Sequence, residues 1–361
     1  MGLVPTPILM GNHQKTSSRL VLFLLTAVLT IFFGEGLIGS SLLWFANVWS
    51  LLVVLPLYFA HFLLLVNIAI RFRRTSLSHL YLLGILMALY EAWITKVLWT
   101  GYPGQEAIVG VYFGLALFEF LTLVLFYHPI FSFIIPLLVL QFILFHETND
   151  PNLLLPNHLK IFQKSWHKTL FVLVFLVFYP ASFLGALFSS VIYLSSVTVL
   201  VSWGLIFLFV FLLQRSMSKT GTNFSIYNLQ MRRKGFIITI SFLVVLYIVT
   251  FLTISPELIP TTPLPYLVIL LTYGIVILLL HRLPTVETTN NAECVENVGL
   301  EHIYSKQHLN YYIILILVLP IPFALIAPIS GWISLVLNLV MIVVGLLLIF
   351  TVIWKAIRSN N

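Results

Sequence analysis

Residues 51–70 read LLVVLPLYFAHFLLLVNIAI and contain no Asp, Glu, Lys or Arg. An apolar run of about 20 residues is long enough to cross the hydrocarbon core of a bilayer as a helix. Similar runs recur along the chain, without the alternation of apolar and polar residues that marks the strands of a membrane β-barrel. Since only helices and closed barrels bond every backbone group in hydrocarbon, the sequence predicts an all-α polytopic transmembrane helical bundle.

The composition agrees with this class. Hydrophobic residues make up 60% of the 361 positions and charged residues 8%, and the mean hydropathy is +1.08. A soluble domain carries about 25% charged residues, so lipid is the main expected partner. The formal net charge of +7 comes from basic residues in short loops. This distribution indicates that they orient the chain in the membrane and contact anionic lipid, rather than bind nucleic acid. The oligomeric state stays open.

The order of apolar runs predicts one integral membrane domain over residues 1–361. About ten full spans are expected, near residues 18–34, 49–70, 78–99, 107–127, 169–188, 191–213, 235–254, 264–281, 309–327 and 331–354. A shorter apolar stretch, 129–145, begins after His128 and has Pro136 near its middle. We divide the domain into an N-terminal half, 1–146, an apolar scaffold half, 169–354, and an acidic cytoplasmic loop, 282–308.

Basic segments give a test of topology. They are the N-terminus with Lys15 and Arg19, residues 71–74, 160–168 and 215–234, and the tail with Lys355 and Arg358. The positive-inside rule places all five, and both termini, on the cytoplasmic side of a cell membrane, which requires an even number of crossings between neighbouring segments. The interval 78–146 holds three apolar stretches. Segment 129–145 is therefore predicted either to re-enter and leave on one side, lining a site or pathway, or to form a short eleventh span.

Three ionisable residues lie near the centres of three successive predicted spans: His61, Glu91 and Glu119. Each acid at that depth costs on the order of 2.5–3.5 kcal/mol on insertion scales. The six spans after Lys168 carry no charged residue in their middles, which places function in the first half of the chain. We expect these three residues to form a proton or cation site. The alternative is that each acid is protonated and bonded to a neighbouring hydroxyl or carbonyl group.

Four secondary candidates are Lys96, Glu35, His128 and His146. Lys96 lies about one turn from the predicted span end, so its ammonium group is expected to snorkel to the interface. Glu35, between two glycines at the predicted outer membrane edge, is interpreted as a solvated loop residue.

The order Tyr90-Glu91 with Lys96, then His128, then His146 to Asp150 loosely resembles that of CPBP-type intramembrane proteases. Those enzymes have a double Glu with an Arg four residues on, a His on a later helix and a His-x-x-x-Asn/Asp pattern. The resemblance implies a hydrolase in which an acid activates water and a His acts as metal ligand or base. This chain has one Glu, a Lys at another spacing and no Phe four residues before His128, so it is not assigned to that family.

Three functions follow as hypotheses. The first is a proton- or cation-coupled transporter or permease. The second is an intramembrane hydrolase, metal-dependent or not, in which Glu91 or Glu119 activates water. The third is a non-catalytic membrane component of a complex. The sequence leaves any cofactor unknown. A metal site is not predicted, because Cys294, His302 and His308 have no zinc-motif spacing.

Overall fold

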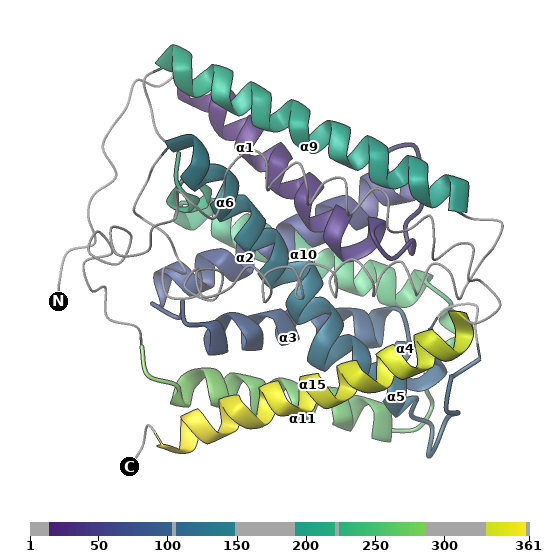
Figure 1. The fold of residues 1–361 in the computed structure, drawn as a ribbon. Helices are drawn as coiled ribbons and strands as arrows, with labels where there is room; N and C mark the ends of the chain where they lie inside the picture. The colour runs from purple at the N-terminus through teal and green to yellow at the C-terminus, as the bar shows by residue number, and fades with distance from the viewer. Residues whose placement is uncertain (1–13, 103–105, 149–191, 221–223, 286–329, 359–361) are drawn as a thin grey trace.

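The computed structural model describes residues 14–102, 106–148, 192–220, 224–285 and 330–358, and these form an all-α bundle (Figure 1). Eight helical segments in the described residues are long and apolar enough to cross a membrane. They are Ser18–Gly36, Ser50–Arg71, Leu77–Ile94, Leu117–Gln141, Val197–Lys219, Arg233–Thr253, Leu264–Arg282 and Asn338–Arg358. The predicted fold class is confirmed.

Several spans are composite. Short π-helical segments extend α1 and precede α2, and a longer one joins α5 to α6. The first half contains α1 (Gln14–Ile31), η1 (Phe32–Gly36), η2 (Ser50–Val54), α2 (Leu55–Arg71), α3 (Leu77–Ile94), α4 (Val97–Thr100), α5 (Leu117–Thr122), η3 (Leu123–Ile134) and α6 (Ile135–Thr148). The second half contains α9 (Ile192–Thr220), η4 (Ile226–Leu229), α10 (Arg233–Thr253), η5 (Pro256–Leu258), α11 (Leu264–Arg282) and α15 (Ser330–Arg358).

The core is built from the first four spans. In three of them 72–78% of the residues are buried, and in the fourth, Ser50–Arg71, 50%. The four later spans bury only 11–28% of their residues. Helix η3 packs along α3, α9 covers α1, and α15 crosses η3 from outside (Figure 1). The first half of the chain therefore forms the interior, and α9, α10, α11 and α15 lie around it.

The predicted break at His128-Pro129 is wrong. Helices α5, η3 and α6 follow one another without interruption from Leu117 to Thr148, so 129–145 is neither a re-entrant segment nor a separate span. Residues 107–116, predicted as the start of a span, form a loop instead. Pro129 lacks an N–H group and would disrupt a regular α-helix, but it lies inside the wider π-helical stretch. The chain therefore crosses the bundle twice between residue 74 and residue 148. The positive-inside rule requires an even number of crossings in this interval, and two crossings meet that requirement.

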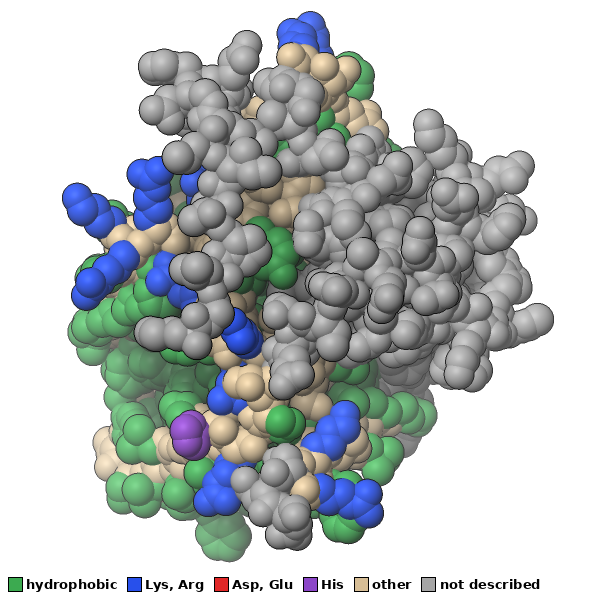
Figure 2. Space-filling view, turned by 90° about the vertical axis from the view of Figure 1, so that its left-hand side faces the viewer, with side chains coloured by type: hydrophobic (Ala, Val, Ile, Leu, Met, Phe, Trp, Pro, Cys, Tyr) green, Lys and Arg blue, Asp and Glu red, His purple; other side chains and the backbone are tan. Residues whose placement is uncertain are grey.

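The basic ends of the helices gather on one face of the bundle, called here the basic end (Figure 2). Three contacts tie this end together. The guanidinium of Arg19 donates to Gln230 O at 2.7 Å, Met231 N donates to Asn67 Oδ1 at 2.7 Å, and Arg74 donates to Leu283 O. The opposite face is called the far end. This arrangement is the one that the positive-inside rule predicts for a cytoplasmic face.

Some predictions fall outside the described residues. These are the spans 169–188 and 309–327, the basic segment 160–168 and the loop 282–308 beyond residue 285. The described chain ends at the basic end at Thr148 and resumes at the far end at Ile192 (Figure 1). The count of ten spans therefore stays a prediction.

Candidate functional site

Four helical elements bring Glu35, Tyr58, Glu91 and His128 together in the interior, in the half of the bundle nearer the far end. We call these four residues the acid cluster. Glu35 comes from η1, Tyr58 from α2, Glu91 from the last turn of α3 and His128 from η3. The side chain of Tyr58 is 0% exposed, that of His128 1% and that of Glu91 16%. Glu91 is thus the member of the cluster with the most access from outside.

The cluster is one continuous row of polar contacts. The Tyr58 hydroxyl donates to Glu35 Oε1 and lies 3.0 Å from Glu91 Oε2. Glu91 Oε2 lies 2.7 Å from His128 Nε2, a close polar contact that lacks the alignment of a hydrogen bond. His128 Nδ1 lies 2.6 Å from Ser132 Oγ, one helical turn further along η3. The row links four helices through side chains that can each give or take a proton.

Glu35 was interpreted from the sequence as a solvated loop residue, and this is wrong. Its side chain is buried, and Oε2 accepts hydrogen bonds from Ser40 Oγ and, at 3.1 Å, from Ser41 Oγ. The chain folds back after η1 through Gly39, which has a φ of 79° that favours glycine. Because of this turn, the hydroxyl groups of Ser40 and Ser41 reach the carboxyl group of Glu35.

Two glycines allow the helices to come close enough for these contacts. A Cβ atom on Gly34 would lie 2.5 Å from Tyr58 Cε1, and one on Gly84 would lie 2.5 Å from the Cα atom of Pro129. Small residues at helix contacts in membranes let backbones approach. Gly34 thus makes room for the phenol beside η1, and Gly84 lets η3 bring His128 against α3.

Sequence reasoning missed Tyr58, Ser132 and the two glycines. A neutral phenol in an apolar run carries no charge to mark it, and one sequence does not show which glycines face another helix. Only the structure shows that Glu35 and His128 both lie on π-helical turns, which occur frequently at functional sites.

His61 lies in a separate aromatic stack. Its ring stacks on Tyr90 with centroids 4.3 Å apart and on Tyr247 with centroids 5.4 Å apart. Its Nδ1 is 2.8 Å from Leu57 O, and its Nε2 contacts the Tyr247 hydroxyl. Both ring nitrogens are therefore partnered outside the acid cluster, and His61 joins α2 to α10.

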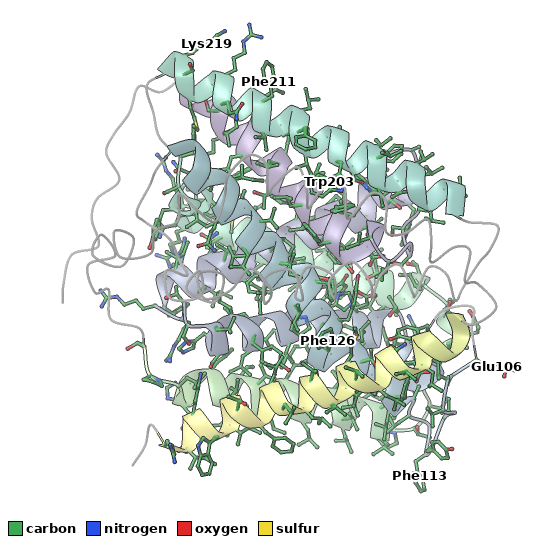
Figure 3. All side chains as sticks on the ribbon, viewed as in Figure 1. Glu106, Phe113, Phe126, Trp203, Phe211 and Lys219 are labelled. Carbon is green, nitrogen blue, oxygen red and sulfur yellow. The ribbon has the colours of Figure 1, made fainter. Side chains whose placement is uncertain are left out.

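Glu119 also lies apart from the acid cluster. The span that contains it begins at Leu117, so Glu119 is in the first turn of α5 rather than at mid-membrane. Its side chain is fully buried and Oε1 accepts a 2.5 Å hydrogen bond from Ile108 N. Oε2 has no hydrogen-bond partner among the described residues. Glu119 holds the loop before α5, whose apolar tip at Phe113 projects outward (Figure 3).

The prediction that Lys96 snorkels is wrong. Helix α3 ends at Ile94, and Lys96 has a left-handed φ of 66° that turns its side chain inward. Its Nζ donates to Ile94 O at 2.9 Å and to Phe251 O at 2.7 Å, and lies 4.7 Å from the centroid of the Phe251 ring. Burial lowers the pKa of this ammonium group from its usual value. Lys96 fastens the far ends of α3 and α10 to each other through their terminal carbonyls.

Replacing Lys96 by Met should therefore lower the free energy of unfolding by about 2 kcal/mol, the range for hydrogen bonds to a charged group. Thermal unfolding in detergent measures the change. Lys219→Met is the control, because Lys219 is exposed at the end of α9 (Figure 3) and should change stability by less than about 0.5 kcal/mol. Equal stability of the two variants would contradict this role.

A metal site is not supported in the part of the chain that is described. There, no group of three or more His, Cys, Asp or Glu side chains is arranged to hold a metal ion. His146 lies on α6, but its side chain and residue Asp150 are outside the described residues.

Comparison with known proteins gives a family. A family described as "Uncharacterized membrane protein family" matches residues 24–359, a range that contains the whole acid cluster. The chain belongs to this family. It is also similar to an "Uncharacterized protein" of Archaeoglobus fulgidus, with 41% identity over 97 residues, or 27% of this chain and 30% of the relative. The chain thus matches less than a third of that relative's length. No solved structure matches it. Family and helices together establish a multi-pass membrane protein.

Proposed function

We propose that this protein is a proton-coupled transporter and that the acid cluster binds the coupling proton. The observation that carries the proposal is the continuous row from Glu35 through Tyr58 and Glu91 to His128, assembled from four helices in the interior of the bundle. Intramembrane acids are costly and are kept where they mark ion pathways or proton relays. Coupling sites of transporters lie where several helices meet inside the membrane.

Within the cluster, Glu91 is the expected point of exchange with solvent, because it is the most exposed of the four. Its carboxylate can take a proton from water, and Tyr58 connects it to Glu35. The proposal therefore retains Glu91 from the predicted site and replaces Glu119 and His61 with Glu35 and His128.

A proton suits the cluster better than a metal cation. The carboxyl oxygens already face hydroxyl groups and an imidazole, which are the partners of a hydrogen-bonded proton. A hard cation such as Ca²⁺ takes 6–8 oxygen ligands, several of them from carboxylates, and no group of three or more His, Cys, Asp or Glu side chains in the described residues is arranged to hold one.

The test is proton uptake by purified protein in nanodiscs, followed with a pH indicator, and proton flux into proteoliposomes under an imposed pH gradient. The Glu91→Gln variant should lose both the uptake step and the flux. Glu119→Gln is the matched control, because it removes a buried acid that does not touch the cluster, and it should keep both. Wild-type protein without a Glu91-dependent uptake step would refute the proposal.

A second candidate is an intramembrane hydrolase, favoured by the 2.7 Å contact of Glu91 with His128. In that case Glu91 would take the proton of an attacking water molecule and His128 would orient the carboxylate. Mass spectrometry of membrane proteins from cells that express wild-type protein or Glu91→Gln separates the two functions. Cleavage products that require Glu91, without proton flux, would replace the transporter by the hydrolase. If Glu91→Gln changes only the stability of the protein, the third hypothesis, a non-catalytic membrane component of a complex, is favoured.

A further inference from the structure

Tyr58 stands between two carboxyl groups. Its hydroxyl contacts Glu35 Oε1 and lies 3.0 Å from Glu91 Oε2. The ring is fully buried and packs against Gly34 of η1. Any larger residue at position 34 would occupy the space of the ring. The phenol is therefore held with its oxygen within hydrogen-bond distance of both acids.

The number of hydrogens in this arrangement is constrained. A phenol has one O–H hydrogen and donates it to one acceptor at a time. Two ionised carboxylates would leave one of the two contacts as oxygen against oxygen without a hydrogen. With one added proton, one carboxyl donates to the phenol oxygen while the phenol donates to the other carboxylate, and both contacts become hydrogen bonds.

The surroundings of Glu35 and Glu91 also favour a single proton on the two carboxyl groups. Glu35 and Glu91 lie at the C-terminal ends of their helical segments, where the helix dipole disfavours two negative charges. The titratable groups that interact electrostatically with this pair are His128 from η3, His61 from α2, and the phenols of Tyr58 and of Tyr90 on α3. Two carboxyl groups that share one site commonly hold a single proton between them.

We infer that Tyr58 relays one shared proton between Glu35 and Glu91. This inference rests on the proposed function and deepens it. In the transfer, the O–H bond of the Glu35 carboxyl breaks as that proton binds the phenol oxygen. The phenol O–H bond breaks as its proton binds Glu91 Oε2. Two O–H bonds break and two form, Tyr58 stays neutral throughout, and the negative charge moves from Glu91 to Glu35.

Glu91 and Glu35 then have different tasks. Glu91 exchanges the proton with solvent, and Glu35, buried beneath Ser40 and Ser41, stores it. Tyr58 is the positioning and relay group of the site, although it carries no charge in either state.

The experiment is an infrared pH titration of the protonated-carboxyl C=O band in the intact protein in nanodiscs. Wild-type protein should show one band that both Glu35→Gln and Glu91→Gln remove. In Tyr58→Phe, which removes only the hydroxyl group, the two acids should titrate as separate steps, and the proton flux should fall by about 100-fold, the lower range for loss of a positioned proton-transfer group. Tyr81→Phe is the control, because the buried Tyr81 hydroxyl lies within hydrogen-bond distance only of the backbone carbonyls of Leu125 and Gly345 among the contacts of the described residues. It should titrate like wild type.

A Tyr58→Phe titration identical to that of wild type would overturn the relay. If Tyr58→Phe does not fold, Tyr58→3-fluorotyrosine keeps the hydroxyl and changes its acidity, and the shared band should then shift; an unchanged band would equally overturn the inference. The two proposals fail separately. Flux that depends on Glu91 with an unchanged Tyr58→Phe titration rejects only the relay, and coupled titration without flux rejects only the transporter.

Discussion

The Gly84→Ala variant is expected to lose about 1–3 kcal/mol of unfolding free energy, the usual cost of overpacking, and most of its Glu91-dependent proton uptake. The added Cβ atom would lie 2.5 Å from Pro129 Cα and 3.0 Å from Pro129 O. Both atoms belong to the backbone of η3, so no side chain can rotate away to make room. Helix η3 has to move from α3, and its movement carries His128 away from Glu91.

Unfolding by denaturant in nanodiscs measures the stability change, and the indicator assay measures uptake. Gly204→Ala on α9 is the matched control, because its Cβ atom would meet nothing within 4 Å. That variant should gain up to about 1 kcal/mol from the better helix propensity of Ala. A Gly84→Ala protein as stable as wild type would show that α3 and η3 do not pack as closely as described.

The His128→Leu variant is expected to lose about 1–3 kcal/mol of unfolding free energy, the range for a buried group that loses its polar partner. His128 is 1% exposed, and its Nε2 lies 2.7 Å from Glu91 Oε2. Without the imidazole, Glu91 keeps only the Tyr58 hydroxyl as a partner among the contacts described here. Its Oε2 atom has then lost the nearer of its two polar partners.

A double-mutant cycle with Glu91→Leu tests this explanation. The double variant should recover much of the stability, because it leaves no unpaired acid, and the coupling free energy should reach about 0.5–3 kcal/mol. Strictly additive losses would mean that the 2.7 Å contact carries no interaction energy. His61→Leu serves as comparison, since its ring nitrogens bind Leu57 and Tyr247 rather than the acid cluster.

The fold class could be predicted because a chain that crosses a bilayer must satisfy all its backbone hydrogen bonds internally, which only helices and closed barrels do. The wrong break at His128-Pro129 has a specific cause. His128-Pro129 was read as a helix break because proline interrupts regular α-helices. Inside the membrane the π-helical turns of η3 accommodate it, and the helix continues to Thr148. The positive-inside rule had already marked this interval as the one with an inconsistent count.

The candidate site could be predicted only in part. Glu91 and His128 were visible as ionisable residues in apolar runs, but depth along a helix does not show which face a side chain is on. Glu119 was assigned to mid-membrane because its span was placed about ten residues too early, and Glu35 to solvent because it lies at the predicted outer membrane edge. Its burial depends on Tyr58, more than 20 positions away, and on the turn at Gly39.

The uneven burial of the two halves has a consequence for how the protein responds to its bilayer. Helices α10, α11 and α15 expose most of their surface, whereas the helices that carry the acid cluster are largely enclosed. A change in acyl-chain length alters the match between bilayer thickness and the outer helices first, at a cost of fractions of a kcal/mol per Å. The inner helices are shielded by that outer layer. Thinner or thicker membranes should therefore shift the melting of the scaffold while the protonation of Glu91 stays the same.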